Sequence, residues 1–234
     1  MKSQMKSRLI HSIHRTILKP TQILGISAIS LGLCITLLLG LCWLFQEVWE
    51  KEVFGFDRSI LLIIHQWSNP SLDSLMISVT RLGDPEWVVG VIVGTLCWLG
   101  LKRRYPEVIM FTIACLGAFV LNSSMKVFFA KARPELWTRL IPETSFSFPS
   151  GHALGSIVLY GAIAYLLSRQ VPKKSRLFYG IAIGIVTAIG FSRLYLGVHW
   201  PTDILAGYGI GFLWLITCTI LLQFHDRKMS KSST

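Results

Sequence analysis

The feature that most constrains this chain is a series of apolar stretches close to the length of a bilayer-crossing helix. Residues 23–45 form the first, an apolar run of about the ~20 residues that a helix needs to cross the hydrocarbon core. Five more candidate spans follow, at residues 86–101, 105–125, 151–167, 177–196 and 202–224. The 234 residues are 52% hydrophobic and 15% charged, whereas soluble domains carry roughly 25% charged residues. The sequence therefore predicts an all-α membrane protein, a six-transmembrane-helix bundle.

Two shorter helical stretches lie between the first and second spans. Residues 57–67 and 72–82 have helical periodicity but are too short to cross, and Gly83-Asp84-Pro85 ends the second. We expect them to be short interfacial helices lying over the bundle. With no internal repeat or long linker, the chain is predicted to have a basic flank at 1–22, a six-span domain at 23–224 and a polar tail at 225–234.

The basic charges predict the orientation and the partners. The net charge of +11 is spread beside apolar segments, which favours anionic membrane lipids over nucleic acid. If the N-terminus is inside, the inner segments hold 15 of the 23 Lys and Arg residues, and the outer segments hold the other eight. The positive-inside rule then places both the N- and C-termini in the cytoplasm. The basic, acid-free residues 1–20 also suit a transit peptide, but we favour a cytoplasmic flank.

Three polar blocks interrupt the apolar pattern, and all fall at helix ends predicted to lie on the outer side. In chain order they are Lys126 with Arg133-Pro134 seven residues later, Pro149-Ser150-Gly151-His152, and Ser192-Arg193 with His199 and Asp203. Charged groups among apolar segments are costly, so their convergence at one membrane face indicates a functional site.

The first two blocks suit phosphate binding. Pro134 disfavours helix at Arg133, so the chain should turn there and direct the guanidinium outward. An arginine fork binds two phosphate oxygens and Lys126 adds a point charge, although either side chain alone would also suit snorkelling to headgroups. Ser150 is a natural N-cap, and Gly151 lets a phosphate approach the first free amides of the next helix.

The two histidines suit proton and phosphoryl transfer. His152 sits at a helix N-terminus, where it can donate a proton to a leaving oxygen, and Arg193 adds a second guanidinium. Pro201 fits the first position of the last span, which leaves His199 just outside it and Asp203 in its first turn. A carboxylate that holds one imidazole nitrogen exposes the other as a nucleophile. In isolation, the pair would equally fit an interfacial histidine and a capping aspartate.

The three blocks together resemble the type-2 phosphatidic acid phosphatase (PAP2) superfamily, which includes lipid phosphate phosphatases, glucose-6-phosphatase and vanadate haloperoxidases. The resemblance implies that His199 attacks phosphorus to form a phosphohistidine supported by Asp203, while His152 protonates the leaving group. It implies that the phosphate oxygens are held by Lys126, Arg133, Ser150, Gly151 and Arg193. No metal and no other cofactor is implied.

The leading hypothesis is a multi-pass hydrolase of the cell membrane that acts on a lipid phosphate or diphosphate at the extracytoplasmic face. Candidate substrates are a polyprenyl diphosphate, phosphatidylglycerophosphate and phosphatidic acid, with Trp137, Arg139 and Phe146 expected to line the entrance. A phosphotransferase that uses the same histidine stays open as an alternative, as does a non-catalytic lipid-binding membrane protein. A vanadate haloperoxidase is disfavoured because it would not need six spans.

Overall fold

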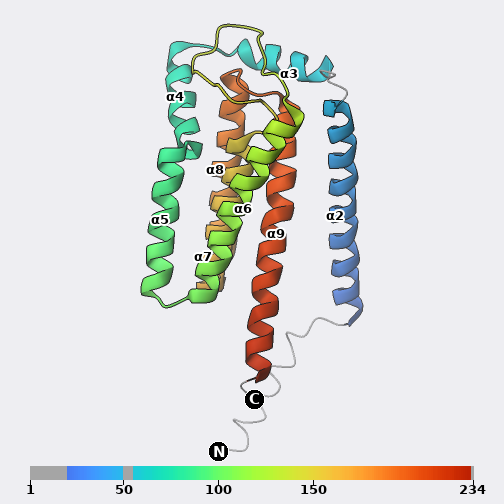
Figure 1. The fold of residues 1–234 in the computed structure, drawn as a ribbon, viewed down its shortest axis with the longest axis vertical. Helices are drawn as coiled ribbons and strands as arrows, with labels where there is room; N and C mark the ends of the chain where they lie inside the picture. Colours follow the sequence, from blue (N-terminus) through green and yellow to red (C-terminus); the bar gives the residue numbers. More distant parts are fainter. Residues whose placement is uncertain (1–19, 50–54, 233–234) are drawn as a thin grey trace, which may run out of the picture. The chain divides into compact units, whose positions relative to one another are not determined.

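The computed structural model describes residues 20–49 and 55–232, and the regular elements within them are helices (Figure 1). These are α2 (Pro20–Trp49), α3 (Gly55–His65), α4 (Pro70–Thr80), η1 (Arg81–Gly83), α5 (Pro85–Leu101), α6 (Tyr105–Phe129), α7 (Gly151–Gln170), η2 (Pro172–Lys174), α8 (Ser175–Tyr195) and α9 (Pro201–Ser232). The basic flank predicted at 1–22 lies outside the described residues except for 20–22, which begin α2. Residues 1–40 and 41–234 form two compact units, and the second holds all three polar blocks.

Four helical segments are long and apolar enough to cross a membrane by themselves. They are α6, α7, the segment from Pro172 to Tyr195, and α9 as far as Met229. The chain is thus a multi-pass, all-helical membrane protein with four to five candidate spans among the described residues. α2 covers the predicted first span at 23–45, and within it the stretch from Ile35 to Gln46 is a shorter apolar helix. The sixth span therefore stays a prediction.

The fifth candidate span is broken, and here the prediction for residues 72–82 was wrong. α4 and α5 qualify as a span only together, with a bend of 44° at the break. Figure 1 shows α4 standing end to end with α5 rather than lying flat, whereas α3 lies across the ends of the other helices as expected. Pro85 explains the break, because a proline cannot continue the preceding helix but fits the first turn of the next.

Helix α7 is the centre of the second unit, packing against α6, α8 and α9. Its core face contributes Leu154, Val158 and Ala162, which cluster with Phe111 and Ala114 of α6. In a bilayer these side chains leave lipid rather than water, so the helices are held together here by van der Waals packing and not by transfer out of water. This packing fixes the positions of the ends of α6, α7, α8 and α9 relative to one another.

Two glycines of α9 let that helix approach α7 closely. A Cβ at Gly207 would lie 2.8 Å from the carbonyl oxygen of Ser150, and one at Gly211 would lie 2.9 Å from that of Leu154. Since real Cβ atoms do not approach backbone oxygens so closely, only glycine fits both positions. The N-termini of α7 and α9, which carry the second and third blocks, are thereby held together.

The helix termini agree with the sequence signals. Ser150 caps α7 by accepting a hydrogen bond from the amide of Ala153 at 3.4 Å. Ala130 ends α6 in the left-handed conformation, with φ of 45°, and so turns the chain toward Arg133. α9 continues through most of the polar tail predicted at 225–234, because no proline or glycine follows Phe224 to end it.

Candidate active site

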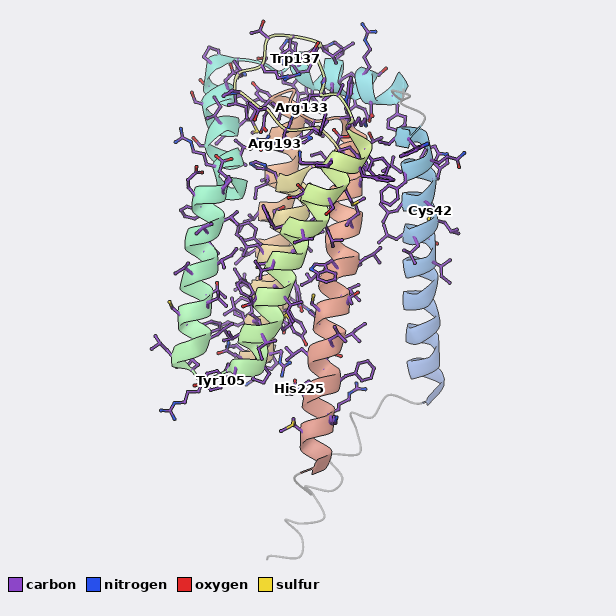
Figure 2. All side chains as sticks on the ribbon, in the orientation of Figure 1. Cys42, Tyr105, Arg133, Trp137, Arg193 and His225 are labelled. Atoms are coloured by element: carbon purple, nitrogen blue, oxygen red, sulfur yellow. The ribbon has the colours of Figure 1, made fainter. Side chains whose placement is uncertain are left out.

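The three predicted blocks converge at one end of the helix bundle. Figure 2 shows Arg133, Arg193 and Trp137 at this end, with Tyr105 and His225 at the opposite end. The blocks also touch directly. The amide of Ser150 donates to the carbonyl of Asp203 at 3.1 Å, joining the second block to the third.

His199 is buried between a carboxylate and a guanidinium. Its Nδ1 lies 3.4 Å from Oδ2 of Asp203, and its Nε2 lies 3.3 Å from Nη1 of Arg133. Burial lowers the pKa of His199 to about 3, and the nearby guanidiniums act in the same direction against the opposing effect of Asp203. The imidazole is therefore neutral at pH 7. With its proton on Nδ1 facing the carboxylate, the Nε2 lone pair faces Arg133.

Asp203 is held by more groups than the sequence suggested. Its Oδ2 accepts from the hydroxyl of Ser147 at 2.5 Å and from the amide of Trp200 at 2.9 Å, while its Oδ1 accepts from Lys131 at 2.9 Å. Asp203 is fully buried and the side chain of Lys131 is 8% exposed. In the sequence, Lys131 lies between Lys126 and Arg133 of the first block. This position is the one signal that could have suggested that Lys131 belongs to the site.

Asp57 of α3 is hydrogen-bonded to Thr202, the residue that precedes Asp203. Its two carboxylate oxygens accept from the amide and hydroxyl of Thr202, at 3.0 and 2.7 Å. Burial raises the pKa of Asp57, although these two hydrogen bonds oppose the shift. Thr202 also accepts from Lys131 at 3.0 Å. Helix α3 is therefore anchored to the first turn of α9 by a buried polar contact, which its amphipathic sequence did not reveal.

The two arginines of the predicted phosphate site meet at one carboxylate. Glu143, on the loop between α6 and α7, accepts from Nη2 of Arg133 at 3.0 Å and from Nη2 of Arg193. Burial opposes the charge of Glu143, but the two guanidiniums outweigh it and hold the pKa of this carboxyl below its ordinary value. The Nε of Arg193 is buried with no hydrogen-bond partner among the described residues. The two guanidiniums thus converge on one carboxylate, and one of their buried donors has no partner among the described residues.

The same loop engages Lys126. Its ammonium donates to the hydroxyl of Ser145 at 3.1 Å and to the carbonyl of Phe146. Arg133 also donates to the carbonyl of Ser145, at 2.8 Å. Lys126 is therefore brought to the loop that covers Arg133, and the two predicted basic ligands share a neighbour.

Trp137 and Arg139 lie on the outer part of this loop; that they line the substrate entrance stays a prediction. Both line an open hollow of about 690 Å³ that Glu143 also lines. Trp137 stacks on His65 with ring centroids 4.0 Å apart. Phe146 does not line this hollow, although 46% of it is exposed.

In the second block, the backbone of Gly151 and the imidazole of His152 are neighbours in the first turn of α7. A Cβ at Gly151 would lie 3.0 Å from Oδ1 of Asn122, so the chain passes close to α6 here. His152 follows in the first turn of α7, and its Nε2 lies 2.9 Å from Oδ1 of Asp84. In the sequence, Asp84 is marked only as part of the Gly83-Asp84-Pro85 signal that ends a short helix. Its partner is 68 residues away in sequence, which no local pattern could show.

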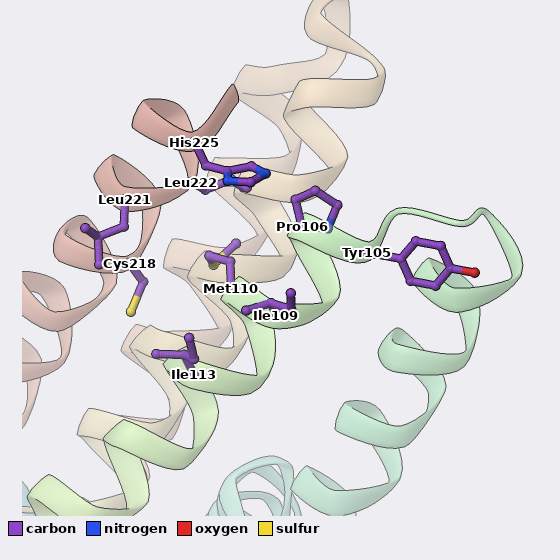
Figure 3. A pocket seen from close by; sticks show the side chains of 9 residues that line it. All are labelled: Tyr105, Pro106, Ile109, Met110, Ile113, Cys218, Leu221, Leu222 and His225. Carbon is purple, nitrogen blue, oxygen red and sulfur yellow. The ribbon is translucent and has the colours of Figure 1, made fainter. Parts of the chain in front are cut away.

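A second cavity lies at the opposite end of the bundle and has a different character. Figure 3 shows it between α6 and α9, lined by apolar side chains that include Ile109, Ile113 and Leu222, with Tyr105 and His225 at its edge. Its volume is about 390 Å³. None of the described residues that line it is an arginine or a lysine, so these residues offer a phosphate no guanidinium or ammonium. Among the described residues, no group of three or more His, Cys, Asp and Glu side chains could hold a metal ion.

A buried imidazole, a carboxylate and two guanidiniums gathered at one end of membrane-spanning helices are groups that phosphoryl transfer uses. The chain belongs to the PAP2 superfamily, whose family model matches residues 106–227. This confirms the family predicted from the three blocks.

Named relatives are phosphatases of membrane lipids. Phosphatidylglycerophosphatase B of Bacillus subtilis is 33% identical over 76% of this chain and 84% of its own length. Undecaprenyl-diphosphatase of Sulfolobus acidocaldarius is 31% identical over 74% of this chain and 81% of its own. The crystal structure of a transmembrane PAP2 type phosphatidylglycerolphosphate phosphatase from Bacillus subtilis has a TM-score of 0.73 at 28% identity, covering 83% of this chain and 96% of that chain. These homologues support a phosphatase enzyme.

Proposed function

We propose that this protein hydrolyses the phosphomonoester or diphosphate of a membrane lipid through a phosphohistidine on His199. The observation that carries the proposal is the meeting of Arg133 and Arg193 at one carboxylate, with Nε2 of His199 beside Arg133. A carboxylate and a phosphate both present oxygens to guanidinium forks, so the position of Glu143 marks where a phosphate group fits.

In the proposed mechanism, Nε2 of His199 attacks phosphorus while the bond to the leaving oxygen breaks. Asp203 accepts the hydrogen bond from Nδ1 and stabilises the positive charge that develops on the ring. His152 gives a proton to the leaving oxygen, which departs as an alcohol or a lipid monophosphate. Water then gives a proton to the now neutral His152 and attacks the phosphohistidine, which returns the electron pair of the P–N bond to His199, restores the protonated His152 and releases inorganic phosphate.

The remaining predicted ligands would hold the phosphate oxygens during both steps. Arg133, Arg193 and Lys126 supply positive charge, and the free amides at the start of α7, beside Ser150 and Gly151, supply fixed dipoles. These donors act where charge develops in the transition state. Removing one such donor typically costs about 10²–10³-fold in kcat.

We propose an extracytoplasmic site, on the strength of the charge distribution. The opposite end of the bundle carries the basic segments at 102–104 and 173–176, which suits the cytoplasm. Thr144 is exposed on the loop of the site end. A cysteine introduced there, in a variant whose native cysteines are replaced, should react with an impermeant maleimide in intact cells. Protection until the cells are opened would reverse the orientation.

The substrate class can be tested on the purified protein in detergent. Phosphate release is measured with phosphatidic acid, phosphatidylglycerophosphate and undecaprenyl diphosphate, comparing kcat/KM. We expect His199→Ala to abolish release, and His225→Ala, a change to an exposed histidine at the other end, to preserve it. Undiminished hydrolysis by His199→Ala would refute the mechanism. Release that falls when an alcohol acceptor is added, with a phosphorylated acceptor appearing, would identify a phosphotransferase instead.

A further inference from the structure

The break between α4 and α5 carries a carboxylate that contacts the second histidine. Oδ1 of Asp84 lies 2.9 Å from Nε2 of His152, and the two side chains are 35% and 15% exposed. The site end of the bundle therefore holds two imidazole–carboxylate pairs. One is His199 with Asp203, and the other is His152 with Asp84.

Gly83 contacts the same imidazole. A Cβ there would lie 2.6 Å from Cδ2 of His152 and 3.3 Å from Cγ2 of Ile189. The ring thus lies directly on the backbone of the break, and a side chain at position 83 would displace it. A simple interruption of a membrane span needs Pro85 to start the next helix, but it needs neither a glycine under an imidazole nor a carboxylate on its nitrogen.

We propose that Asp84 is a positioning residue for His152, holding Nε2 so that Nδ1 delivers the proton to the leaving oxygen. This inference rests on the proposed function, in which His152 is the general acid. Before transfer, the imidazolium carries protons on both nitrogens, and the charge of Asp84 stabilises it. As the P–O bond breaks, the Nδ1 proton moves to the leaving oxygen, and the neutral ring keeps its Nε2 proton in the hydrogen bond to Asp84.

The test compares two leaving groups. An alkoxide, as in short-chain phosphatidic acid, needs a proton to depart, whereas the phenolate of p-nitrophenyl phosphate departs without one. Since kcat/KM reports only steps up to phosphoryl transfer to His199, the later hydrolysis does not obscure the comparison. Asp84→Asn keeps the shape of the side chain and removes its charge. We expect it to lower kcat/KM for phosphatidic acid about 10- to 100-fold, part of the ~10²–10⁴-fold that general acids contribute, and less than about threefold for the aryl ester.

Controls separate positioning from folding. Glu86→Gln changes an exposed carboxylate two residues along and should alter neither value. Gly83→Ala should shift the ring and give the same selective loss with Asp84 intact. In a His152→Ala background, Asp84→Asn should cost nothing further. Equal losses for both substrates, or no loss for either, would overturn the inference.

The outcome for His152 distinguishes this inference from the function on which it rests. If His152→Ala loses activity only on phosphatidic acid while Asp84→Asn loses none, the positioning role fails and the general acid stands. If His152→Ala does not discriminate between the two esters, the general acid itself is wrong.

Discussion

The ammonium of Lys131 lies 2.9 Å from Oδ1 of Asp203, and the other oxygen of that carboxylate, Oδ2, is the one that faces His199. One carboxylate therefore links a cation to the imidazole that is proposed to attack phosphorus. Because Asp203 is fully buried, its charge depends on this partner and on the hydroxyl and amide that also donate to it.

Replacing Lys131 should impair both stability and activity. Lys131→Met leaves a buried charge uncompensated, which typically costs about 3–5 kcal/mol, and it removes one of the groups that hold Asp203 against His199. We expect Lys131→Met to unfold at a lower temperature than the wild type. We also expect it to have a lower kcat when equal amounts of folded protein are assayed. Lys102→Met, at an exposed position at the other end of the bundle, is the matched control. Wild-type kcat in folded Lys131→Met would show that Lys131 does not act on the nucleophile.

Neutralising Glu143 should strengthen anion binding. Glu143→Gln removes the charge that now occupies both arginines, so inorganic phosphate should inhibit at lower concentration. We expect a change of about tenfold, since a charge-assisted hydrogen bond contributes about 1.5–3 kcal/mol and part of this is offset by the remaining amide. Glu135→Gln, on the same loop with an 88% exposed side chain, should leave the inhibition constant unchanged. Weaker inhibition in Glu143→Gln would mean that the carboxylate orders the arginines instead of competing with phosphate.

Acid should destabilise the fold through His199. Its pKa is lowered to about 3 in the folded protein, whereas an unfolded histidine takes up a proton near pH 6.5. The unfolded state therefore binds more protons as pH falls from about 6.5 toward 3, and stability declines across that window by up to about 1.4 kcal/mol per pH unit. Thermal unfolding measured from pH 7 to pH 4 should show this slope, and His199→Gln should reduce it. An equal slope in His199→Gln would assign the effect to other groups.

The approach of α9 to α7 gives a prediction for glycine. Gly207→Ala would put a methyl group 2.8 Å from the carbonyl of Ser150, so the two N-termini must separate. Overpacking of this kind costs about 1–3 kcal/mol, and kcat should fall with it because Ser150 and Asp203 lie on those two helix ends. Gly184→Ala on α8 meets nothing within 4 Å and should instead be neutral or stabilising. Comparing the unfolding temperatures and kcat of both variants checks the expectation.

The sequence predicted the parts of the site whose signals are local. Hydropathy located the apolar helices from 105 onward, and helix-end chemistry located Ser150 and Pro201 at the starts of α7 and α9. The same reasoning failed at α4, because an 11-residue helix looks interfacial unless the geometry of the following break is known.

The missed site residues have partners far away in the sequence. Asp57 contacts Thr202 across 145 residues, Lys131 contacts Asp203 across 72, and Asp84 contacts His152 across 68. Periodicity and capping describe contacts within a few turns, so they carry no information on these pairs. In the sequence, Asp57, Asp84 and Lys131 are recognisable only as charged residues near apolar segments.

The bent pair of helices α4 and α5 contacts two side chains of the candidate site. Thr80, just before the break, accepts from Nη1 of Arg193 at 2.9 Å, and Asp84, just after it, contacts His152. Straightening the 44° bend would displace both the guanidinium that is proposed to bind phosphate and the imidazole that is proposed to donate a proton. Turnover should thus respond to the thickness of the surrounding bilayer, which loads this helix along its length, and vesicles of graded acyl-chain length provide the measurement.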